Sequence, residues 1–369
     1  MTQWQHNTMQ TPDCTIVRAL REPDRLDQFS MAEWDALIRQ GRRADLLARL
    51  HWLAQEKNLL ASLPEAPRAH LEAARVIADK QATAVAWEVR KIHEAIAPSG
   101  APLILLKGAA YRMAALAAGR GRVFSDVDIL VPKQRINHVE AALMLHGWVA
   151  TQHDAYDQRY YRTWMHEIPP LTHIRRLSVI DVHHAILPET ARLRPDPALL
   201  LAAARPIVDQ PGVYTLAPAD MVLHSASHLF CGEFEHGLRD LSDIDLLLRE
   251  FGTVAGFWDG LVPRAQQLDL ARPLYYALYW TTQLFATPVP SPVLREIDAC
   301  ARPSMPVNTL MNALLQRALA PDHASCHDAL SVPARGLLYA RAHWLRMPPH
   351  LLAYHLAHKA LFPPRAAAN

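Results

Sequence analysis

The sequence LILLKGAAYRMAALAAGRGRVFSDVDILVP, residues 103–132, holds two short apolar runs separated by a helical pattern. The first run is continuously apolar and ends in glycine, which is typical of a strand buried on both faces. Residues 109–119 then have the pattern of a helix closed by a glycine. FSDVDILVP, residues 124–132, alternates and is rich in β-branched residues, so it predicts a second strand that stops at a proline.

The second strand carries two acidic residues, Asp126 and Asp128. Successive side chains of a strand point to opposite faces, so these two carboxylates share one face. They repel each other unless a cation lies between them, and magnesium is usually held by one or two carboxylates together with substrate phosphates. Two such ions can stabilise the attacking and the leaving oxygen of phosphoryl or nucleotidyl transfer. The pair therefore predicts a site for two Mg²⁺ ions, with Mn²⁺ as the alternative.

The turn at Lys107 and Gly108 predicts a phosphate site next to this pair. A strand that ends in glycine and leads directly into a helix presents backbone N–H groups and a positive helix end to anions. Lys107 and Arg122 are cations expected near a triphosphate, although each has a structural alternative: Lys107 at a strand end, and Arg122 paired with a nearby aspartate. Ser125 is expected to orient an aspartate or the ligand.

A third carboxylate, Asp181, interrupts the apolar segment SVIDVHHAI, residues 178–186. An aspartate in a buried strand is costly unless it is paired or binds a metal. We expect Asp181 to bind one ion and to help deprotonate an attacking hydroxyl. His183 lies on the same face of that strand, where it is expected to contact phosphate or hold Asp181.

The sequences on both sides extend this core. Residues 31–60 predict two helices separated at Gly41, and residues 70–97 predict a long amphipathic helix. RINHVEAALMLHGW, residues 135–148, predicts a further helix. Residues 156–168, YDQRYYRTWMHEI, and residues 176–187, RLSVIDVHHAIL, predict further strands.

This order of elements predicts an α+β protein with a mixed sheet flanked by helices. We expect a helical N-terminal region over residues 1–97, the sheet-containing core over residues 98–216 and a helical C-terminal domain over residues 217–369.

The composition limits the partners and the location. With 38 Lys and Arg against 36 Asp and Glu, the formal net charge of +2 argues against strong general nucleic-acid binding. The four cysteines show no CxxC spacing, which argues against a disulfide framework or a structural zinc site. The N-terminus lacks the pattern of a signal peptide, and no apolar run is long enough for a membrane span. We therefore expect a cytoplasmic protein without membrane contact.

Residues 103–248 resemble the uncharacterised bacterial nucleotidyltransferase family of the DNA polymerase β superfamily. The resemblance is carried by LILLKGAAYRMAAL, GRGRVFSDVDILVP, VIDVHHAIL and the helical HSASHLF…GLRDLSDIDLLL. It implies a minimal nucleotidyltransferase core. The family's LKG turn, Arg-x-x-(Ser/Gly)-Asp-x-Asp pattern and acidic strand before His correspond here to Lys107, Gly108, Arg122, Ser125, Asp126, Asp128, Asp181 and His183. The superfamily often has Gly-Ser or Gly-Gly at the phosphate turn, whereas Ala109 follows Gly108 here and supplies no hydroxyl.

The resemblance implies Mg²⁺-dependent transfer of NMP from an NTP, taken as ATP, to an unidentified hydroxyl acceptor with release of pyrophosphate. That acceptor is a small molecule or a protein side chain. A second reading is a nucleotide-binding scaffold with weak or lost catalysis, as Ala109 suggests. A third is a metal hydrolase that uses His323, His327 and Asp328.

Two other patterns favour structural roles. Ser242-Asp243-Ile244-Asp245 repeats the local pattern of residues 125–128, but its leucines have helical spacing. Positions i and i+2 of a helix diverge, so these carboxylates are expected to cap a helix or form salt bridges, for example with Arg239. His224 and His228 lie one helical turn apart, where packing is the favoured interpretation.

Overall fold

The computed structural model describes residues 14–150 and 154–354, and all structural statements below refer to these residues. Its centre is a seven-stranded mixed sheet in the order β3-β4-β5-β2-β1-β7-β6. The strands are β1 (Leu103–Leu105), β2 (Asp126–Leu130), β3 (Trp148–Ala150), β4 (Leu171–His173), β5 (Val179–His183), β6 (Arg205–Pro206) and β7 (Val213–Thr215). The predicted α+β class is confirmed.

The sheet register brings together elements that are distant in sequence. β1 pairs antiparallel with β2 and parallel with β7. β2 pairs in parallel with β5, and Asp128 is directly opposite Asp181. Val127 and Ile129 of β2 are buried in the core, while Asp126 and Asp128 use the alternate positions. β2, the central strand, therefore packs its apolar side chains into the core and carries its two aspartates at the alternate positions.

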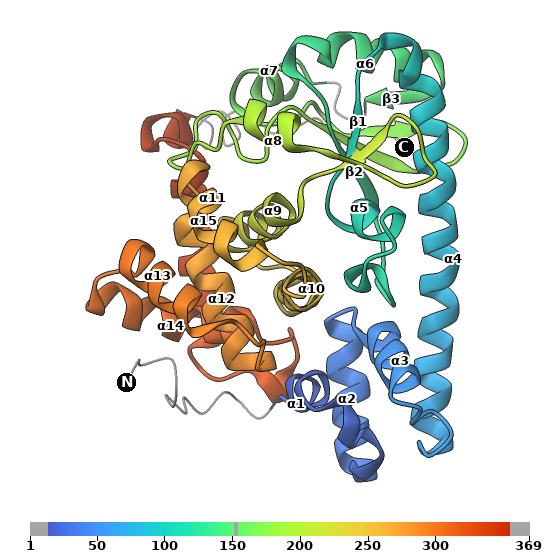
Figure 1. The fold of residues 1–369 in the computed structure, drawn as a ribbon, viewed down its shortest axis with the longest axis vertical. Helices are drawn as coiled ribbons and strands as arrows, with labels where there is room; N and C mark the ends of the chain where they lie inside the picture. Colours follow the sequence, from blue (N-terminus) through green and yellow to red (C-terminus); the bar gives the residue numbers. More distant parts are fainter. Residues whose placement is uncertain (1–13, 151–153, 355–369) are drawn as a thin grey trace.

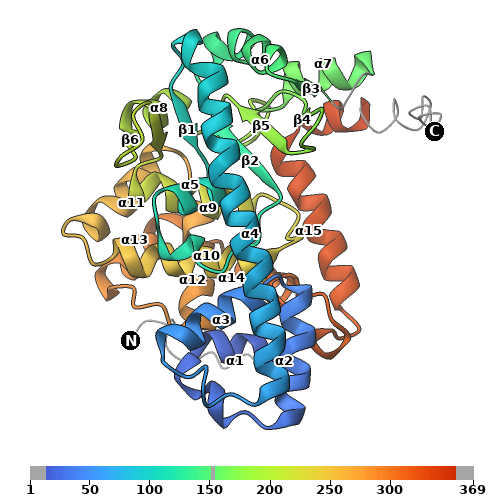
Figure 2. The same ribbon diagram turned by 90° about the vertical axis from the view of Figure 1, so that its right-hand side faces the viewer.

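Helices cover the sheet, and those of the N-terminal part of the chain continue beyond it. The helices before β4 are α1 (Thr15–Arg21), α2 (Met31–Arg43), α3 (Leu47–Glu56), α4 (Glu65–Ile96), α5 (Lys107–Met113), α6 (Ile136–Leu145) and α7 (Ala155–Trp164). A capping box between Ser30 and Glu33 starts α2. The 32-residue α4 runs past the sheet and down to the first helices, as Figures 1 and 2 show.

A second group of helices follows β7. It consists of α9 (Pro218–Phe230), α10 (Gly237–Phe251), α11 (Phe257–Gln267), α12 (Ala271–Phe285), α13 (Ser291–Ala301), α14 (Met305–Ala318) and α15 (Ser331–Arg346), while the short α8 (Pro197–Ala203) precedes β6. The helices α9, α10 and α12 pack on one another, and α5 lies between them and α4 (Figure 1). None of the described helices has the combined length and apolarity to cross a bilayer.

Three local predictions were wrong. Residues 156–168 were expected to form a strand, but α7 occupies most of this segment because its aromatic residues recur at i+4: Tyr156 and Tyr160 stack, and Tyr160 contacts Trp164 edge-on. Gly41 does not separate the first two helices, since α2 continues to Arg43 and the chain turns at Asp45 with φ of 55°.

The helix after β1 is also shorter than predicted. Regular α5 ends at Met113, and a separate 3₁₀ turn reaches Gly119. Ala115, with φ of 56°, breaks the helix between the two, a backbone conformation that the alanine-rich sequence does not reveal.

Candidate active site

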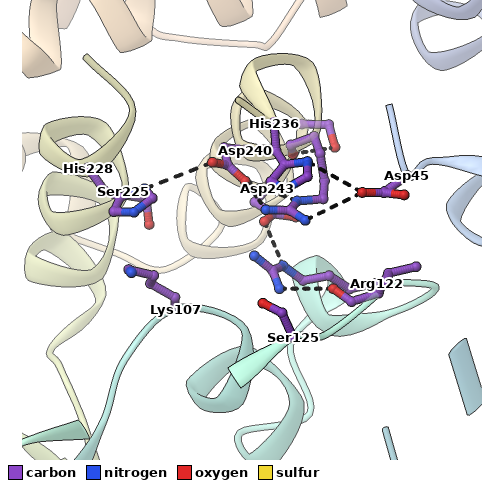
Figure 3. Close-up of polar contacts among 12 residues, drawn as sticks. Asp45, Lys107, Arg122, Ser125, Ser225, His228, His236, Asp240 and Asp243 are labelled. Atoms are coloured by element: carbon purple, nitrogen blue, oxygen red, sulfur yellow. Dashed lines mark hydrogen bonds and ion pairs between the residues drawn. The ribbon is translucent and has the colours of Figure 1, made fainter. Parts of the chain in front are cut away.

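A cavity of about 230 Å³ lies between the acidic end of β2 and the helices α9 and α10. Polar and charged side chains dominate its lining, which Figure 3 shows in part. The lining residues are Lys107, Gly108, Tyr111, Arg122, Ser125, Asp126, Asp128, Ser225, His228, Glu235, His236, Arg239, Asp240 and Asp243. Six of the predicted site residues therefore meet at one cavity, and the other half of its wall comes from the C-terminal helices.

The two aspartates of β2 enter this cavity in different environments. Asp126 begins the strand and accepts a hydrogen bond from Oγ of Ser125 at 2.8 Å. Asp128 is only 5% exposed, and its Oδ1 accepts hydrogen bonds from Nζ of Lys107 at 2.9 Å and from Nε2 of His183 at 3.0 Å. The strand thus presents one accessible carboxylate and one that is held by two cationic partners.

Electrostatics keeps Asp128 ionised. Burial alone would raise its pKa, but the charge of Lys107 and the hydrogen bond from His183 outweigh it and hold the pKa well below the usual range. Burial likewise opposes the charge of Lys107 and of His183, yet the carboxylate of Asp128 raises the pKa of both. The three groups form a buried charge cluster with Asp128 as the shared acceptor.

Asp181 lies directly beside Asp128 on the neighbouring strand. Burial, together with the negative charges of Asp128 and Glu167, raises the pKa of Asp181 to about 7. Its Oδ1 is buried and has no hydrogen-bond partner among the described residues. Such an unsatisfied, easily protonated carboxylate is costly in a purely structural role and is suited to bind a cation or to accept a proton.

The predicted phosphate turn lies against this cluster. The backbone N–H of Leu106 donates to the carbonyl of Asp128 at 3.0 Å, so α5 begins beside the acidic strand. Lys107 has φ of 44°, a left-handed conformation that is uncommon for a residue other than glycine and is often found at functional sites. Gly108 faces the cavity, whereas Ala109 is buried and is not part of the cavity lining.

Arg122 shows why position 108 is glycine. A Cβ on Gly108 would collide with the guanidinium of Arg122. Nε of Arg122 donates to Oδ2 of Asp243 at 2.8 Å, as Figure 3 shows. Arg122 is therefore paired with an aspartate, as its structural alternative predicted. It still lines the cavity.

The C-terminal helices add a wall of charged residues that the sequence analysis did not assign to the site. Arg239 on α10 bonds Asp240 at 3.0 Å and lies 3.9 Å from Asp45, which is also 3.3 Å from Nδ1 of His236. His228 on α9 lies 3.9 Å from Asp240. The signal for His228 was its spacing from His224, but only His228 reaches the cavity; His224 is buried, and burial with the charge of Lys107 lowers its pKa to about 3.

The segment 242–245 has the predicted structural role, with partners other than the suggested Arg239. Asp243 accepts from Arg49 at 2.7 Å and from Arg122, whereas Asp245 accepts from Arg249 at 2.8 Å on another side of α10. Its two carboxylates diverge, as helical geometry requires.

The proposed hydrolase residues do not form a metal-binding group. His323 bonds Ser325, His327 is 3.3 Å from Asp322, and Asp328 is bound by Arg317. In the part of the chain that the structure describes, the one group of three potential ligands with mutual spacing within 4.8 Å is His166, Glu167 and His183. The hydrolase interpretation therefore has no support from the geometry.

The predicted aspartates are adjacent without forming such a compact trio. Asp126 and Asp128 share one strand and Asp181 pairs with Asp128 across the sheet. Magnesium needs only one or two protein carboxylates when substrate phosphates complete its shell. These three carboxylates offer only oxygen ligands, and Oδ1 of Asp181 is unsatisfied among the described residues. The set therefore fits such an ion.

Comparison with protein families gives a match over most of the chain. The model of a family described as uncharacterised nucleotidyltransferase matches residues 30–286, which include the sheet, the cavity and both of its walls. Searches of curated proteins and of solved structures found no match.

Proposed function

The chain belongs to the uncharacterised nucleotidyltransferase family, and from this premise we propose that it transfers an NMP from a magnesium-bound NTP to a hydroxyl acceptor. ATP is the first donor to test. The acceptor is a small molecule or a side-chain hydroxyl of a protein. One observation carries the proposal: the accessible Asp126 and the charge-clustered Asp128 border the same cavity as Lys107 and Arg122.

Asp126, Asp128 and Asp181 are the residues proposed to hold magnesium. When bound there, the ion supplies neutralisation of the phosphate charge that develops during transfer. Asp128 is already ionised at neutral pH because Lys107 and His183 lower its pKa. It therefore needs no deprotonation before it binds a cation.

The cations of the cavity are proposed to bind the triphosphate. Lys107 bonds Asp128 through a flexible four-carbon stem, so its ammonium can shift from the carboxylate to phosphate oxygens a short distance away. Arg122 is fixed by Asp243 and faces phosphate as a preorganised charge. Arg239, His228 and His236 extend this wall towards the rest of the nucleotide or the acceptor.

Asp181 is proposed as the proton acceptor. The acceptor oxygen loses its proton to the carboxylate of Asp181 and forms a bond to the α-phosphorus, and the bond from that phosphorus to the bridging oxygen breaks as pyrophosphate leaves. In the metal-free chain, burial and the charges of Asp128 and Glu167 raise the pKa of Asp181, which makes its carboxylate a stronger base than an exposed aspartate. His183 keeps Asp128 in position during the step.

A screen with α-labelled NTPs tests the proposal. The full chain is incubated with Mg²⁺, each of the four NTPs and either a metabolite extract or a protein extract, and labelled products and pyrophosphate are measured. We expect wild type and the control Asp35→Asn, on an exposed helical pair with Arg39, to label the same product. Asp126→Asn is expected to label none. Equal labelling by Asp126→Asn, or calorimetric binding of Mg-ATP without pyrophosphate from any acceptor pool, would contradict the proposed transfer; the second result would favour the scaffold reading.

A further inference from the structure

A short segment before β4 pairs with the end of β5. Glu167 forms an antiparallel bridge with His183, the N–H of Ile168 donates to Val182 at 3.1 Å, and the N–H of His184 donates to His166 at 2.8 Å. Directly paired residues of neighbouring strands place their side chains on the same face. The backbone therefore holds the side chains of Glu167 and His183 next to each other.

The potential ligand atoms of this segment have nearly the spacing of a metal site. Nδ1 of His183 lies 3.3 Å and Nε2 of His166 lies 4.0 Å from Oε2 of Glu167. Ligand atoms of a tetrahedral zinc ion are about 3.3–3.5 Å apart, since each is about 2.0–2.1 Å from the metal. One contact already has this separation, and the other needs to close by about half an ångström.

Nδ1 of His183 faces this position, and zinc would replace the proton that this nitrogen carries when the ring is charged. The His183 side chain is 4% exposed, and its Nδ1 lacks hydrogen-bond geometry to any described residue despite its proximity to Glu167. A buried, unpaired polar atom costs about 1–3 kcal/mol. Its other nitrogen, Nε2, bonds Asp128. A histidine held by a carboxylate on one nitrogen and a metal on the other is a recurrent arrangement in metalloproteins.

We propose that His166, Glu167 and His183 bind one Zn²⁺ ion. Two imidazoles and one carboxylate are a zinc ligand set that leaves the fourth position to water or a further ligand. The side chains of His166 and Glu167 are each 18% exposed, which gives the ion access from solvent. The aspartates of the cavity offer oxygen atoms alone, the preference of magnesium. The zinc would fix the ring of His183 and, through it, the carboxylate of Asp128.

Zinc binding by the full-length chain tests this site without reference to catalysis. Chelator-stripped protein is titrated with Zn²⁺ in competition with a chromophoric chelator, and Co²⁺ replaces Zn²⁺ to report tetrahedral geometry through its visible spectrum. The variants are Glu167→Gln, His166→Gln and Asp128→Asn. The matched control is Glu189→Gln, which removes a carboxylate 3.9 Å from the adjacent His184. Circular dichroism of the metal-free proteins establishes that each variant is folded.

We expect wild type and Glu189→Gln to bind one equivalent of zinc with equal affinity. Glu167→Gln and His166→Gln should weaken binding by at least about 100-fold, and Asp128→Asn, which acts through His183, by about 10–100-fold. The absence of a stoichiometric equivalent in wild type, or unchanged affinity in Glu167→Gln, would overturn the assignment.

Asp126→Asn separates this inference from the proposed function. We expect it to bind zinc as wild type does, even though it should lose nucleotidyl transfer. If neither wild type nor any variant transfers a nucleotide, but zinc binding still depends on Glu167, the proposed function is wrong and the zinc site stands. A loss of zinc affinity in Asp126→Asn as large as that in Glu167→Gln would place the ion at the aspartates and refute the site.

Discussion

Residues 125–128 and residues 242–245 share the pattern Ser-Asp-aliphatic-Asp but belong to different secondary structures. On β2 the alternation of side chains brings Asp126 and Asp128 to the same cavity. On α10 the carboxylates of Asp243 and Asp245 point to different neighbours. The same local pattern therefore gives a candidate ion site in a strand and two separate ion pairs in a helix.

The two segments also differ in how their charges are balanced. Asp243 is 3% exposed and pairs with the guanidinium groups of Arg49 and Arg122 from other parts of the chain, while Asp245 pairs with Arg249 of the same helix. The strand segment keeps Asp126 accessible and pairs Asp128 with a lysine and a histidine, Lys107 and His183. Arginine holds a carboxylate with a rigid, planar fork of donors, whereas lysine is a point charge on a flexible stem. The helix segment still serves the cavity indirectly, because Asp243 holds Arg122 at its edge.

The largest expected difference between the segments is in catalysis. Asp128→Asn should reduce nucleotidyl transfer at least about 10⁴-fold, about 5.4 kcal/mol of transition-state free energy, because an amide cannot hold the metal as a carboxylate does. Asp245→Asn, which lies outside the cavity lining, should keep wild-type turnover per folded molecule. Steady-state rates measured on both variants decide this. Similar losses in the two variants would remove the functional distinction between strand and helix.

The loss of stability, in contrast, should be larger for a substitution in the helix segment than for one in the strand segment. Asp243→Asn leaves two buried guanidinium groups without a charged partner and is expected to lower the free energy of unfolding by about 3–4 kcal/mol. Asp126→Asn should change it by less than about 0.5 kcal/mol, since this side chain is partly exposed and, within residues 14–150 and 154–354, is bonded by Ser125 alone. Urea denaturation of the two variants measures both values. A greater loss for Asp126→Asn would contradict the assigned roles.

The pH dependence of stability should also have opposite signs. Burial and the charge of Asp128 raise the pKa of Asp181 to about 7, so between pH 4 and 7 the folded state holds a proton that the unfolded state has released. Stability contributed by this protonation is lost as the pH rises through about 7. Asp243 is opposite: its arginine partners outweigh burial and lower its pKa below 3.8, so its contribution is lost only as the pH falls below that range.

Denaturation in EDTA at pH 5 and pH 8 tests these signs. Wild type should lose about 3 kcal/mol of stability between these two pH values through Asp181, and Asp181→Asn should not show this loss. Asp243→Asn should lower stability by the same amount at both. An unchanged pH slope in Asp181→Asn would show that Asp181 does not carry the proton.

The smallest difference between the two segments is expected in the stability cost of removing the hydroxyl of Ser125 or Ser242. Oγ of Ser242 accepts from Arg49 at 2.7 Å and donates to the carbonyl of Arg239, so Ser242→Ala should cost about 1 kcal/mol of unfolding free energy. Ser125→Ala should cost less than about 0.5 kcal/mol, because Ser125 is exposed. Thermal unfolding of the two proteins compares them directly, and equal costs would count against the buried role of Ser242.

Periodicity in the sequence predicted the strands β1, β2 and β5 and most helices, because each of these elements has a clear apolar face. It also distinguished the strand segment from its helical copy. The prediction failed at residues 156–168, where aromatic residues suggested β structure although their i+4 spacing forms α7. The sequence analysis also assigned no role to Glu167, which lies beyond the end of α7, where the chain does pair with β5.

The remaining site residues depend on long-range packing. Arg122 and Asp243 are 121 positions apart, and no local pattern identifies one as the partner of the other. Arg239 and His236 reach the cavity only because α10 packs beside the sheet core. The proposed ion ligands were accessible to sequence reasoning because they lie on two strands with regular alternation, whereas the opposite wall required the coordinates.

The parallel pairing of β2 with β5 also constrains how the chain folds during synthesis. Asp126 and Asp128 leave the ribosome well before Val179–His183, so β2 has an open edge until the chain has grown past β5. Such pairings form slowly, and an open strand edge can recruit other chains. Fragments that end between these two strands should therefore aggregate, and the nascent protein should depend on chaperones most over that interval.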